Sequence, residues 1–487
     1  MLHTVIFKDE IKIWWEYNSE TAKKGYYVVK KDGIEYLRTD KTHCTFGALA
    51  PNAEYVFEVE LYNALGECIC REQTLVKTSK DKEKIDVTKA PYFALGDGKT
   101  LNTKALQKAI NDCKSGQYVY FPQGVYLTGA LYLHSDMEIR LDKNAVLQGA
   151  DEPKDYLPKV WSRFEGIEME CYASLLNIGK LDHKAGYTTK NIVIKGGKIC
   201  GGGERLRQKM IANAKTEFES KESPARRRGR LISILNSENV VLSDVEMGNS
   251  PSWNVHMIYS NNVVTCGGKI FSQRISNGDG WDPDSSTNCI LFDIDFDTGD
   301  DCVAIKSGKN PEGNIINRPC EHIRVFDCRA KGGNGIAIGS EMSGGVNDVK
   351  IWDCDIETSF AGFNIKSTPS RGGYIKNVAV YRSKTSKILF RTFMNCNNDG
   401  DAANILPELE NFTFEDIFIT GVETYTDNQR IDKANAVDAI GYPTEPLKNL
   451  KLKNIRLKYR PMMPWHIFDM TNVENVEIEN ITCESYM

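Results

Sequence analysis

The segments Asn191-Ile192-Val193-Ile194 and Asn377-Val378-Ala379-Val380 each join an asparagine to a short run with apolar residues at alternate positions. Segments of this kind begin at Asn191, Asn239, Asn262, Asn288, Asn377, Asn411, Asn449 and Asn475, with weaker copies at His322 and Asp348. The gaps between them run from 23 to 48 residues, and most are below 35. A period of two is typical of strands, and the interval suits one coil of a solenoid.

These repeats predict an all-β fold in which parallel strands stack coil upon coil as a parallel β-helix. In such a fold the inward residues form one continuous core, while long loops on one side wall a groove. Asparagine suits the turns, because it tolerates left-handed backbone and its side chains can stack in ladders along the axis. A leucine-rich repeat is the competing solenoid, but the chain lacks the leucine consensus and the regular period of that class.

The second distinctive stretch is Asn277-Gly278-Asp279-Gly280-Trp281-Asp282-Pro283-Asp284, which is followed by Thr298-Gly299-Asp300-Asp301. Neighbouring carboxylates repel, and each raises the pKa of the others. Folding alone would spread such charges out, whereas a hydrolytic site needs a protonated and an ionised carboxyl close together. The stretch therefore predicts an acid/base centre, with a calcium site or an acidic turn as the alternative.

The spacing of these acids favours a single site. Strict alternation along the segment 301–305 would turn Asp301 toward the core, where an unpaired carboxylate is costly. We therefore expect Asp300 and Asp301 at a bend where the strand begins, with Gly299 supplying the freedom for both to face the groove. Asp279 precedes Asp300 by 21 residues, about one coil, which stacks it beside the pair.

These motifs resemble those of the polygalacturonase family of glycoside hydrolases, family 28. The Asn-Thr-Asp motif of the family matches Asn277-Gly278-Asp279, its Gly/Gln-Asp-Asp motif matches Gly299-Asp300-Asp301, and the interval between them agrees. The resemblance covers roughly residues 85 to 487, through the further segments 96–100, 121–124, 230–232, 249–256 and 338–345. The segment 339–345, together with an N-terminal fibronectin-like domain, is similar to the bacterial exo-acting members.

The resemblance implies a right-handed parallel β-helix that releases galacturonic acid from pectin-derived oligosaccharides, with inversion and without a cofactor. By correspondence, Asp300 is the general acid, and Asp279 and Asp301 hold and deprotonate the water. Inversion needs one protonated carboxyl and, across a gap of about 6.5 to 9.5 Å, a carboxylate that activates water. Two neighbouring anions raise the pKa of Asp300, as a general acid requires.

Two motifs of the family are incomplete in this chain. The Gly-His-Gly motif should fall at 332–335, where Asn334 stands and no histidine is present, and the Arg-Ile-Lys motif reads Asn364-Ile365-Lys366. In the family, the arginine and the lysine contact the sugar on the leaving-group side, chiefly through its carboxylate. Asparagine offers neither the charge nor the fork of an arginine.

Three explanations of these changes stay open. The two asparagines contact a neutral leaving sugar, such as the rhamnose of rhamnogalacturonan; Arg371 or another arginine supplies the missing charge; or the enzyme is weakened. Release of galacturonate from pectic oligosaccharides is favoured, with a rhamnogalacturonan-directed hydrolase as the alternative. Glu341 either touches substrate or braces a loop. The candidate substrate-binding residues are Lys366, Asn364, Asn334, Asn277, Arg371 and Glu341.

Two further classes of protein are less favoured. A pectate lyase shares the β-helix architecture, but it abstracts a C5 proton with a basic residue and calcium. A non-catalytic glycan-binding β-helix would have no reason to keep three aspartates at the spacing of the family.

Residues 1–80 predict a small separate domain. Short strands at 11–17, 26–30, 36–38, 55–63 and 68–77 alternate with turn residues, which is typical of an antiparallel sandwich. The segment 49–59 resembles part of a fibronectin type III domain, which implies a packing module, or a module that shapes one end of the substrate cleft or binds glycan. A charged linker precedes the catalytic domain at 85–487, where a helix over 104–113 is expected to cap the stack.

The composition excludes several function classes. Charges are dispersed around a formal net charge of −5, so no broad footprint for nucleic acid is visible, and the triplet 226–228 of arginines is interpreted as a solvated loop. No segment approaches the roughly 20 apolar residues of a membrane span, and no signal peptide is seen. The fourteen cysteines lack the paired spacings of a zinc site. We therefore expect a cytoplasmic enzyme with reduced thiols and no bound metal.

Overall fold

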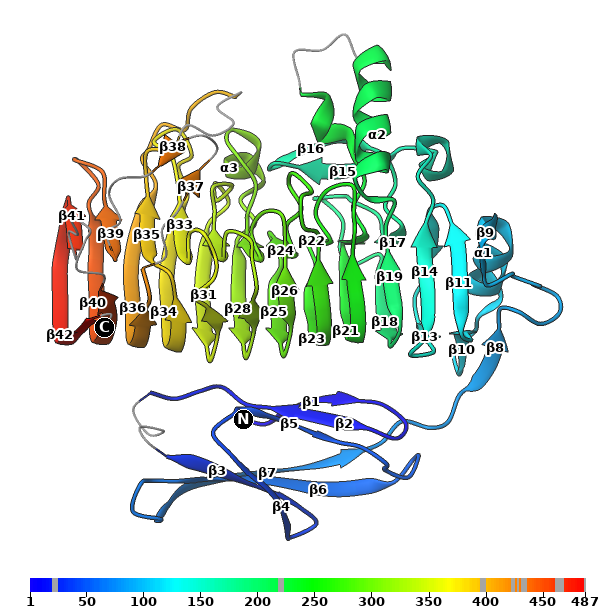
Figure 1. Ribbon diagram of the computed structural model, residues 1–487, viewed down its shortest axis with the longest axis horizontal. Coiled ribbons are helices and arrows are strands. Elements are labelled where there is room, and N and C mark those ends of the chain that lie inside the picture. The colour runs from blue at the N-terminus through cyan, green and yellow to red at the C-terminus, as the bar shows by residue number, and fades with distance from the viewer. Residues whose placement is uncertain are drawn as a thin grey trace. The chain divides into compact units, whose positions relative to one another are not determined.

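The computed structural model describes residues 1–19, 25–217, 223–394, 400–421, 425–426, 429–430, 436–459 and 468–485. The chain divides into two compact units, Met1–Glu83 and Lys84–Met487. Both units are built mainly of strands (Figure 1).

The first unit is a sandwich of two antiparallel sheets, with the strand orders β1-β2-β5 and β4-β3-β6-β7. The strands are β1 (His3–Ile6), β2 (Ile11–Trp14), β3 (Tyr26–Lys31), β4 (Ile34–Thr39), β5 (His43–Phe46), β6 (Glu54–Tyr62) and β7 (Cys68–Lys77). The Tyr55 hydroxyl accepts a hydrogen bond of 2.9 Å from the backbone N–H of Ala50, which resembles the tyrosine corner of immunoglobulin-like sandwiches. The assignment to the fibronectin type III class stays a prediction.

The second unit is a parallel β-helix, as the repeats predict. Its parallel strands form an 11-stranded and a 20-stranded sheet, in which each coil pairs with the next (Figure 1). The 11-stranded sheet contains β12 (Leu131–Leu133), β17 (Leu176–Gly179), β20 (Ile232–Leu235), β22 (Val255–Ile258), β24 (Trp281–Asp284), β27 (Val303–Ile305), β30 (Ile336–Ile338), β33 (Phe363–Lys366), β35 (Ile388–Arg391), β39 (Val437–Ile440) and β41 (Phe468–Thr471).

The 20-stranded sheet forms the remaining sides of the coils. It contains β8 (Glu83–Asp86), β9 (Asp97–Leu101), β10 (Gln117–Phe121), β11 (Gly124–Thr128), β13 (Met137–Leu141), β14 (Ala145–Gly149), β18 (Thr189–Lys195), β19 (Lys198–Cys200), β21 (Ser237–Gly248), β23 (Asn261–Phe271), β25 (Thr287–Phe292), β26 (Asp295–Asp297), β28 (Cys320–Phe326), β29 (Arg329–Ala330), β31 (Val346–Trp352), β32 (Asp355–Ile356), β34 (Tyr374–Thr385), β36 (Glu408–Ile419), β40 (Leu447–Tyr459) and β42 (Val473–Ser485).

The asparagines that open the repeats all adopt left-handed backbone, with φ between 52° and 63°. Their side chains form ladders along the axis of the stack. Asn411 Nδ2 donates to Asn377 Oδ1 at 2.9 Å, and Asn449 Nδ2 donates in turn to Asn411 Oδ1 at 2.8 Å. The repeat therefore marks one turn of each coil, and the predicted reason for asparagine at this turn is confirmed.

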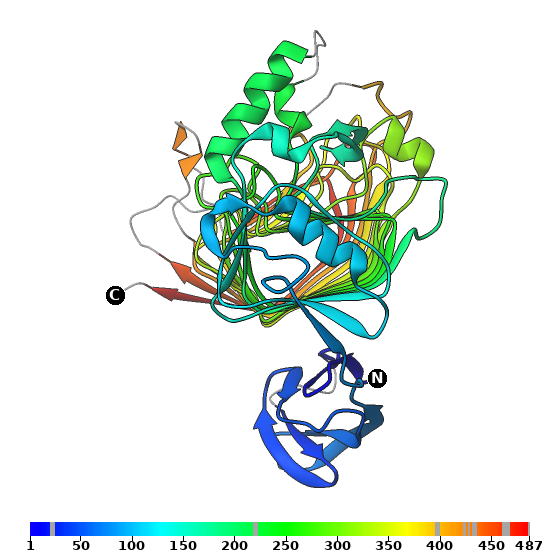
Figure 2. The same cartoon turned by 90° about the vertical axis from the view of Figure 1, so that its right-hand side faces the viewer.

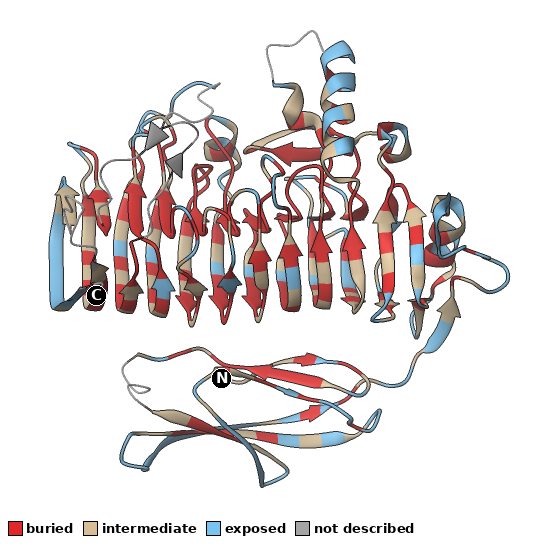
Figure 3. Cartoon of the chain, viewed as in Figure 1, coloured by how far each residue is buried: buried red, intermediate tan, exposed pale blue. Residues whose placement is uncertain are grey.

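One apolar core runs through the coils (Figure 3). Aromatic side chains stack in register within it or beside it: the rings of Phe292 and Phe326 lie 4.9 Å apart, and those of Phe326 and Trp352 lie 4.4 Å apart. Helix α1 (Thr103–Asp112) buries Leu106 and Ile110 against the first coils and lies across that end of the stack (Figure 2). The expected helical cap is therefore confirmed.

Loops and short elements project between the strands of the two sheets. They include η1 (Pro153–Tyr156), the antiparallel hairpin of β15 (Val160–Phe164) and β16 (Ile167–Cys171), α2 (Gly203–Glu217), η2 (Pro224–Arg227), α3 (Glu312–Ile316), β37 (Tyr425–Thr426) and β38 (Gln429–Arg430). Among the helices of the described ranges, none has the length and apolar character that a membrane crossing requires.

The variant Asn411→Ala should lower the melting temperature more than Asn411→Gly does. Both variants lose two ladder hydrogen bonds, but alanine adds a left-handed backbone cost of about 1–2 kcal/mol that glycine avoids. Thermal unfolding followed by circular dichroism measures the difference, with the exposed Asn213→Ala of α2 as control. Equal losses for the alanine and glycine variants would contradict the proposed role of the turn.

Candidate active site

Parallel register sets the geometry of the site. Side chains of the 11-stranded sheet alternate, so Trp281 of β24 and Val303 of β27 point into the core, while residues next to them point outward. Trp281 lies directly opposite Val303, which places Asp279 level with Asp301, one coil apart. The backbone N–H of Gly280 donates to the carbonyl of Asp301 at 2.9 Å and fixes this alignment.

Asp300 and Asp301 stand at the expected bend, because β27 begins only at Val303. Asp301 is buried and Asp300 is half-buried. The backbone N–H of Asp301 donates to Asp300 Oδ1 at 3.0 Å, so the pair is held in one conformation. The structure thus brings Asp279, Asp300 and Asp301 to one place, as the sequence predicts.

Lys306 is the counter-ion of the first acids. Its Nζ lies 3.0 Å from Asp279 Oδ2 and also contacts Asp282 Oδ1, and all three side chains are buried. Burial alone would lower the pKa of Lys306, but Asp279 and Asp282 raise it well above its ordinary value. Lys306 is therefore a buried ammonium that two carboxylates share.

These carboxylates titrate well above the ordinary range of aspartate. Burial raises the pKa of Asp282 to about 6, against the opposing charge of Lys306. Burial also raises the pKa of Asp279 well above its usual value. Asp279 Oδ1 and Asp282 Oδ2 are buried and find no hydrogen-bond partner among the residues that the structure describes. Each carboxylate therefore keeps one oxygen that is free to accept a hydrogen bond.

Asp300 has the properties of a proton donor. Burial, followed by the negative charges of Asp279 and Asp301, raises the pKa of Asp300 to about 7. Asn334 of the next coil donates from Nδ2 to Asp300 Oδ1 at 2.8 Å. Asn334 therefore contacts the candidate acid directly.

Lys366 supplies the second counter-ion. Its Nζ lies 2.5 Å from Asp301 Oδ2. Burial would lower the pKa of Lys366, but the charges of Asp301 and Asp300 raise it above the ordinary value. Asn364, on the same outward face of β33, is buried, and its Oδ1 has no hydrogen-bond partner within the described part of the chain.

Two other predicted residues line the edges of this cluster. Asn277 Oδ1 accepts a hydrogen bond of 2.7 Å from Arg228 Nη2, which fixes the turn that leads to Asp279. Glu341 is buried, and its charge helps to raise the pKa of Lys306. Their contacts with a sugar stay predictions.

Arg371 lies elsewhere and is fully buried. Its Nε donates to the carbonyl of Ser340 at 2.9 Å, and its Nη1 donates to Asn310 Oδ1 at 2.7 Å. These contacts brace the loop that follows β30. The guanidinium is thus engaged by protein acceptors, and its predicted contact with substrate stays a prediction.

The hairpin β15–β16 packs on the outward face of the coils that precede the acids. Arg163 Nη1 forms a buried ion pair of 2.8 Å with Asp284 Oδ1 of β24. The ring of Phe164 stacks on Trp253, which precedes β22, at 4.7 Å, and Arg230 Nη2 donates to the Arg163 carbonyl. The hairpin therefore covers the sheet around β20 and β22, up to the edge of β24.

The interpretation of the arginine triplet as a solvated loop is wrong for two of its members. Arg226 is buried, with Nε 2.6 Å from Glu165 Oε2 in the hairpin turn. Arg228 is buried as well, and donates to the carbonyls of Pro251 and Ser276 besides Asn277. Both anchor the turn of the hairpin or the turn of the acidic stretch, because each guanidinium finds several acceptors there.

The sequence interpretation missed Lys306. The signal was present in the segment 300–306, where alternation after Val303 and Ile305 turns residue 306 outward, to the side of the acids. Trp281 is a core residue that donates from Nε1 to Thr265 Oγ1 at 3.1 Å.

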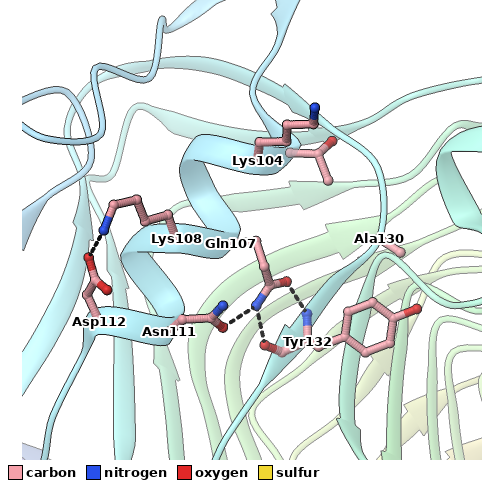
Figure 4. Close-up of a pocket in the computed structure, with 8 residues that line it drawn as sticks. Lys104, Gln107, Lys108, Asn111, Asp112, Ala130 and Tyr132 are labelled. Carbon is pink, nitrogen blue, oxygen red and sulfur yellow. Dashed lines mark hydrogen bonds and ion pairs between the residues drawn. The ribbon is translucent and has the colours of Figure 1, made fainter.

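A surface depression lies at the other end of the sheet, between α1 and β12 (Figure 4). Gln107 bridges it by hydrogen bonds to both backbone polar groups of Tyr132, at 2.9 Å each. These bonds satisfy the edge of β12, and the depression contains none of the predicted site residues. The depression therefore belongs to the contact between the capping helix α1 and the first strand of the sheet.

Comparison with known proteins agrees with this geometry. A model described as glycosyl hydrolases family 28 matches residues 164–389, and one described as rhamnogalacturonase A/epimerase, pectate lyase-like, matches residues 90–155. A probable polygalacturonase of Vitis vinifera is 31% identical over 402 residues, which cover 79% of this chain and 77% of the relative. The chain belongs to glycosyl hydrolase family 28.

Other known proteins share sequence or fold with this chain. An exo-poly-alpha-D-galacturonosidase of Dickeya chrysanthemi is 29% identical over 373 residues, which cover 70% of this chain and 61% of that protein. The structure of a family 28 exopolygalacturonase of Yersinia enterocolitica superposes with a TM-score of 0.81 at 22% identity, over 99% of this chain and 98% of that chain. The predicted family and fold class are confirmed.

The variant Lys306→Met should reduce kcat/KM at neutral pH by at least about 100-fold. Without the ammonium, burial raises the pKa of Asp279 and Asp282 further, so the ionised acids appear only at higher pH. A pH profile of kcat/KM should show the acidic limb moved upward by about one unit or more. Lys384→Met, which removes an exposed ion pair with Asp355 on the 20-stranded sheet, is the control and should keep the original profile. An unmoved acidic limb in Lys306→Met would refute the counter-ion role.

Proposed function

We propose that this family 28 enzyme is an inverting glycosidase that releases galacturonic acid from the ends of pectin-derived oligosaccharides. The observation that carries the proposal is the contrast within one acid cluster. Asp300 is half-buried with a pKa raised to about 7, while Asp301 is buried in an ion pair with Lys366. Inverting hydrolysis requires a protonated carboxyl and, across a gap that admits the water, a carboxylate that activates it.

In the proposed reaction, Asp300 donates its proton to the glycosidic oxygen as the bond to the anomeric carbon breaks. A water molecule attacks the opposite face of that carbon, and its proton passes to Asp301, which forms an ion pair with Lys366. Asp279 Oδ1, a buried oxygen without a hydrogen-bond partner among the described residues, accepts a hydrogen bond from the same water and orients it. Proton exchange with solvent then restores both carboxyls.

We further propose that hairpin β15–β16 makes the action terminal. Its buried ion pair and its stack of Phe164 on Trp253 fill the outward face on one side of the acids. A polysaccharide chain cannot continue through a packed apolar contact, so only a terminal sugar fits between the hairpin and Asp300. The relatives named as exo-acting enzymes support the same mode.

The variant Asp300→Asn should lower kcat on oligogalacturonate by at least about 1,000-fold, because an amide cannot protonate the leaving oxygen. Its far-ultraviolet circular dichroism should match that of the unmodified enzyme. In the unmodified enzyme, kcat/KM should fall about tenfold per pH unit above pH 7, where Asp300 loses its proton. Asp297→Asn, which removes an exposed partner of Gln273, is the control. Retained activity in Asp300→Asn would eliminate this assignment.

Replacing residues 161–170 by a short glycine-serine loop should change the products. With the hairpin gone, chains can cross the coils before β24, so oligogalacturonides should appear alongside the monomer. Product profiles on polygalacturonate measure the change. Trp161→Ala alters only an exposed hairpin residue and should keep the monomer as the product. A loop variant that stays active and still releases monomer alone would remove the hairpin as the cause of terminal action.

A further inference from the structure

Three cationic side chains project from the outward face of the coils on the same side of the sheet: Lys306 after β27, Lys366 of β33 and Arg391 of β35. Lys366 and Arg391 lie directly opposite each other in parallel strands, which places them about 4.8 Å apart along the stack. Ile388 and Phe390 of β35 are core residues, so Arg391 projects to the side of the acids. The cation row therefore extends beyond the acid pair, away from hairpin β15–β16.

Arg391 differs from the two lysines in its partners. Lys306 and Lys366 each form a close ion pair with an aspartate. Within the described residues, the guanidinium of Arg391 forms no hydrogen bond and no ion pair, although it is only partly exposed. The charges of Asp301 and Asp438 act on it, but burial outweighs them and lowers the pKa of Arg391 below its ordinary value.

A partly buried guanidinium without an acceptor is an unfavourable arrangement in a folded protein. Lys387, which directly precedes β35, adds positive charge nearby, and burial together with Arg391 lowers the pKa of Lys387 to about 8. Asp438 of β39 acts on both cations, but Arg391 forms no ion pair with it within the described residues. An anionic group of the ligand would remove the free-energy cost of burying the guanidinium without an acceptor.

We propose that Arg391 binds the carboxylate of the sugar in the leaving position, and that this sugar is a second galacturonate. The inference rests on the proposed function and names its substrate class. Because the hairpin closes one side of the acids, the leaving sugar extends over the other side, toward β33 and β35. The guanidinium that the family places at residue 364 is thus supplied one strand further along, and the short side chain of Asn364 leaves space for it.

This assignment discriminates between the two leaving sugars that the sequence leaves open. A neutral rhamnose would leave Arg391 unpaired in the complex, whereas a uronate accepts two parallel N–H···O bonds from the guanidinium. The charge of Arg391 then selects the leaving sugar, and the amides of Asn334 and Asn364 do not. Asn334 already donates to Asp300.

The test measures kcat/KM of the full chain and of Arg391→Gln and Arg391→Lys on three substrates. These are digalacturonate, digalacturonate methyl-esterified on the leaving sugar, and p-nitrophenyl α-galacturonide, whose leaving group has no carboxylate. Arg391→Gln should lower kcat/KM on digalacturonate by about 10- to 100-fold, as expected for the loss of one charge-assisted bidentate contact. It should lower kcat/KM on the methyl-esterified and p-nitrophenyl substrates by less than about threefold. Arg391→Lys should fall in between, because it keeps the charge without the fork.

Arg329→Gln is the matched control, since this arginine pairs with Asp293 and Asp295 on the 20-stranded sheet, and it should leave all three values unchanged. Equal losses of Arg391→Gln on all substrates, or no loss on digalacturonate, would overturn the inference. A clear preference of the unmodified enzyme for a galacturonosyl-rhamnose disaccharide would overturn it as well. Absence of hydrolysis of any galacturonide by the unmodified enzyme would refute the proposed function itself, which separates the two failures.

Discussion

The alignment of each coil with the next is the constraint on which the rest of the molecule depends. A side-chain period of two means that a shift of one residue would exchange the core for the outside on a whole strand. Left-handed asparagines hold the alignment at the turns, where their amides bond from coil to coil. The same alignment sets Asp279 level with Asp301, although the two acids lie on different coils. The geometry of the acid cluster is thus a direct product of strand register.

The acid cluster is stable because its counter-ions come from the same outward rows. Four aspartates, at 279, 282, 300 and 301, lie near two lysines, so the cluster keeps a negative excess. Burial, followed by the charges of Asp279 and Asp301, raises the pKa of Asp300 to about 7. If each aspartate were paired with a lysine, Asp300 would lose its proton too readily. If no lysine were present, the buried carboxylates would destabilise the fold. The intermediate balance allows folding and proton donation together.

Much of the fold and the position of the acids followed from local pattern. Three local patterns carried this information: the asparagine repeat, the alternation after Gly299, and the interval between Asp279 and Asp300. Tertiary contacts do not alter what these patterns specify. The family resemblance assigned roles to the acids, and the expected cytoplasmic location stays a prediction. In the first unit, the four-residue strands β1 and β5 are too short to show alternation clearly.

Contacts between distant coils could not be predicted in this way. The pairing of Arg163 with Asp284 joins residues 121 positions apart, and no periodicity connects them. The burial of Arg226 and Arg228 likewise depends on acceptors in the hairpin and in the acidic turn. Arg391 belongs to no motif noted in the sequence. Its position beside Lys366 is evident only from the pairing of β35 with β33. Tertiary partners, and not local preference, decide the state of these charges.

The hairpin anchored by Arg163 and Phe164 also determines how reaction speed relates to the amount of polymer. When only the last sugar fits, the effective substrate is the number of chain ends, and a long chain offers no more of them than a short one. Throughput on a given mass of pectin then rises as other enzymes fragment it. If the hairpin makes the action terminal, as proposed, then the packing of Phe164 against Trp253 makes the rate of this hydrolase depend on how finely its substrate has already been cut.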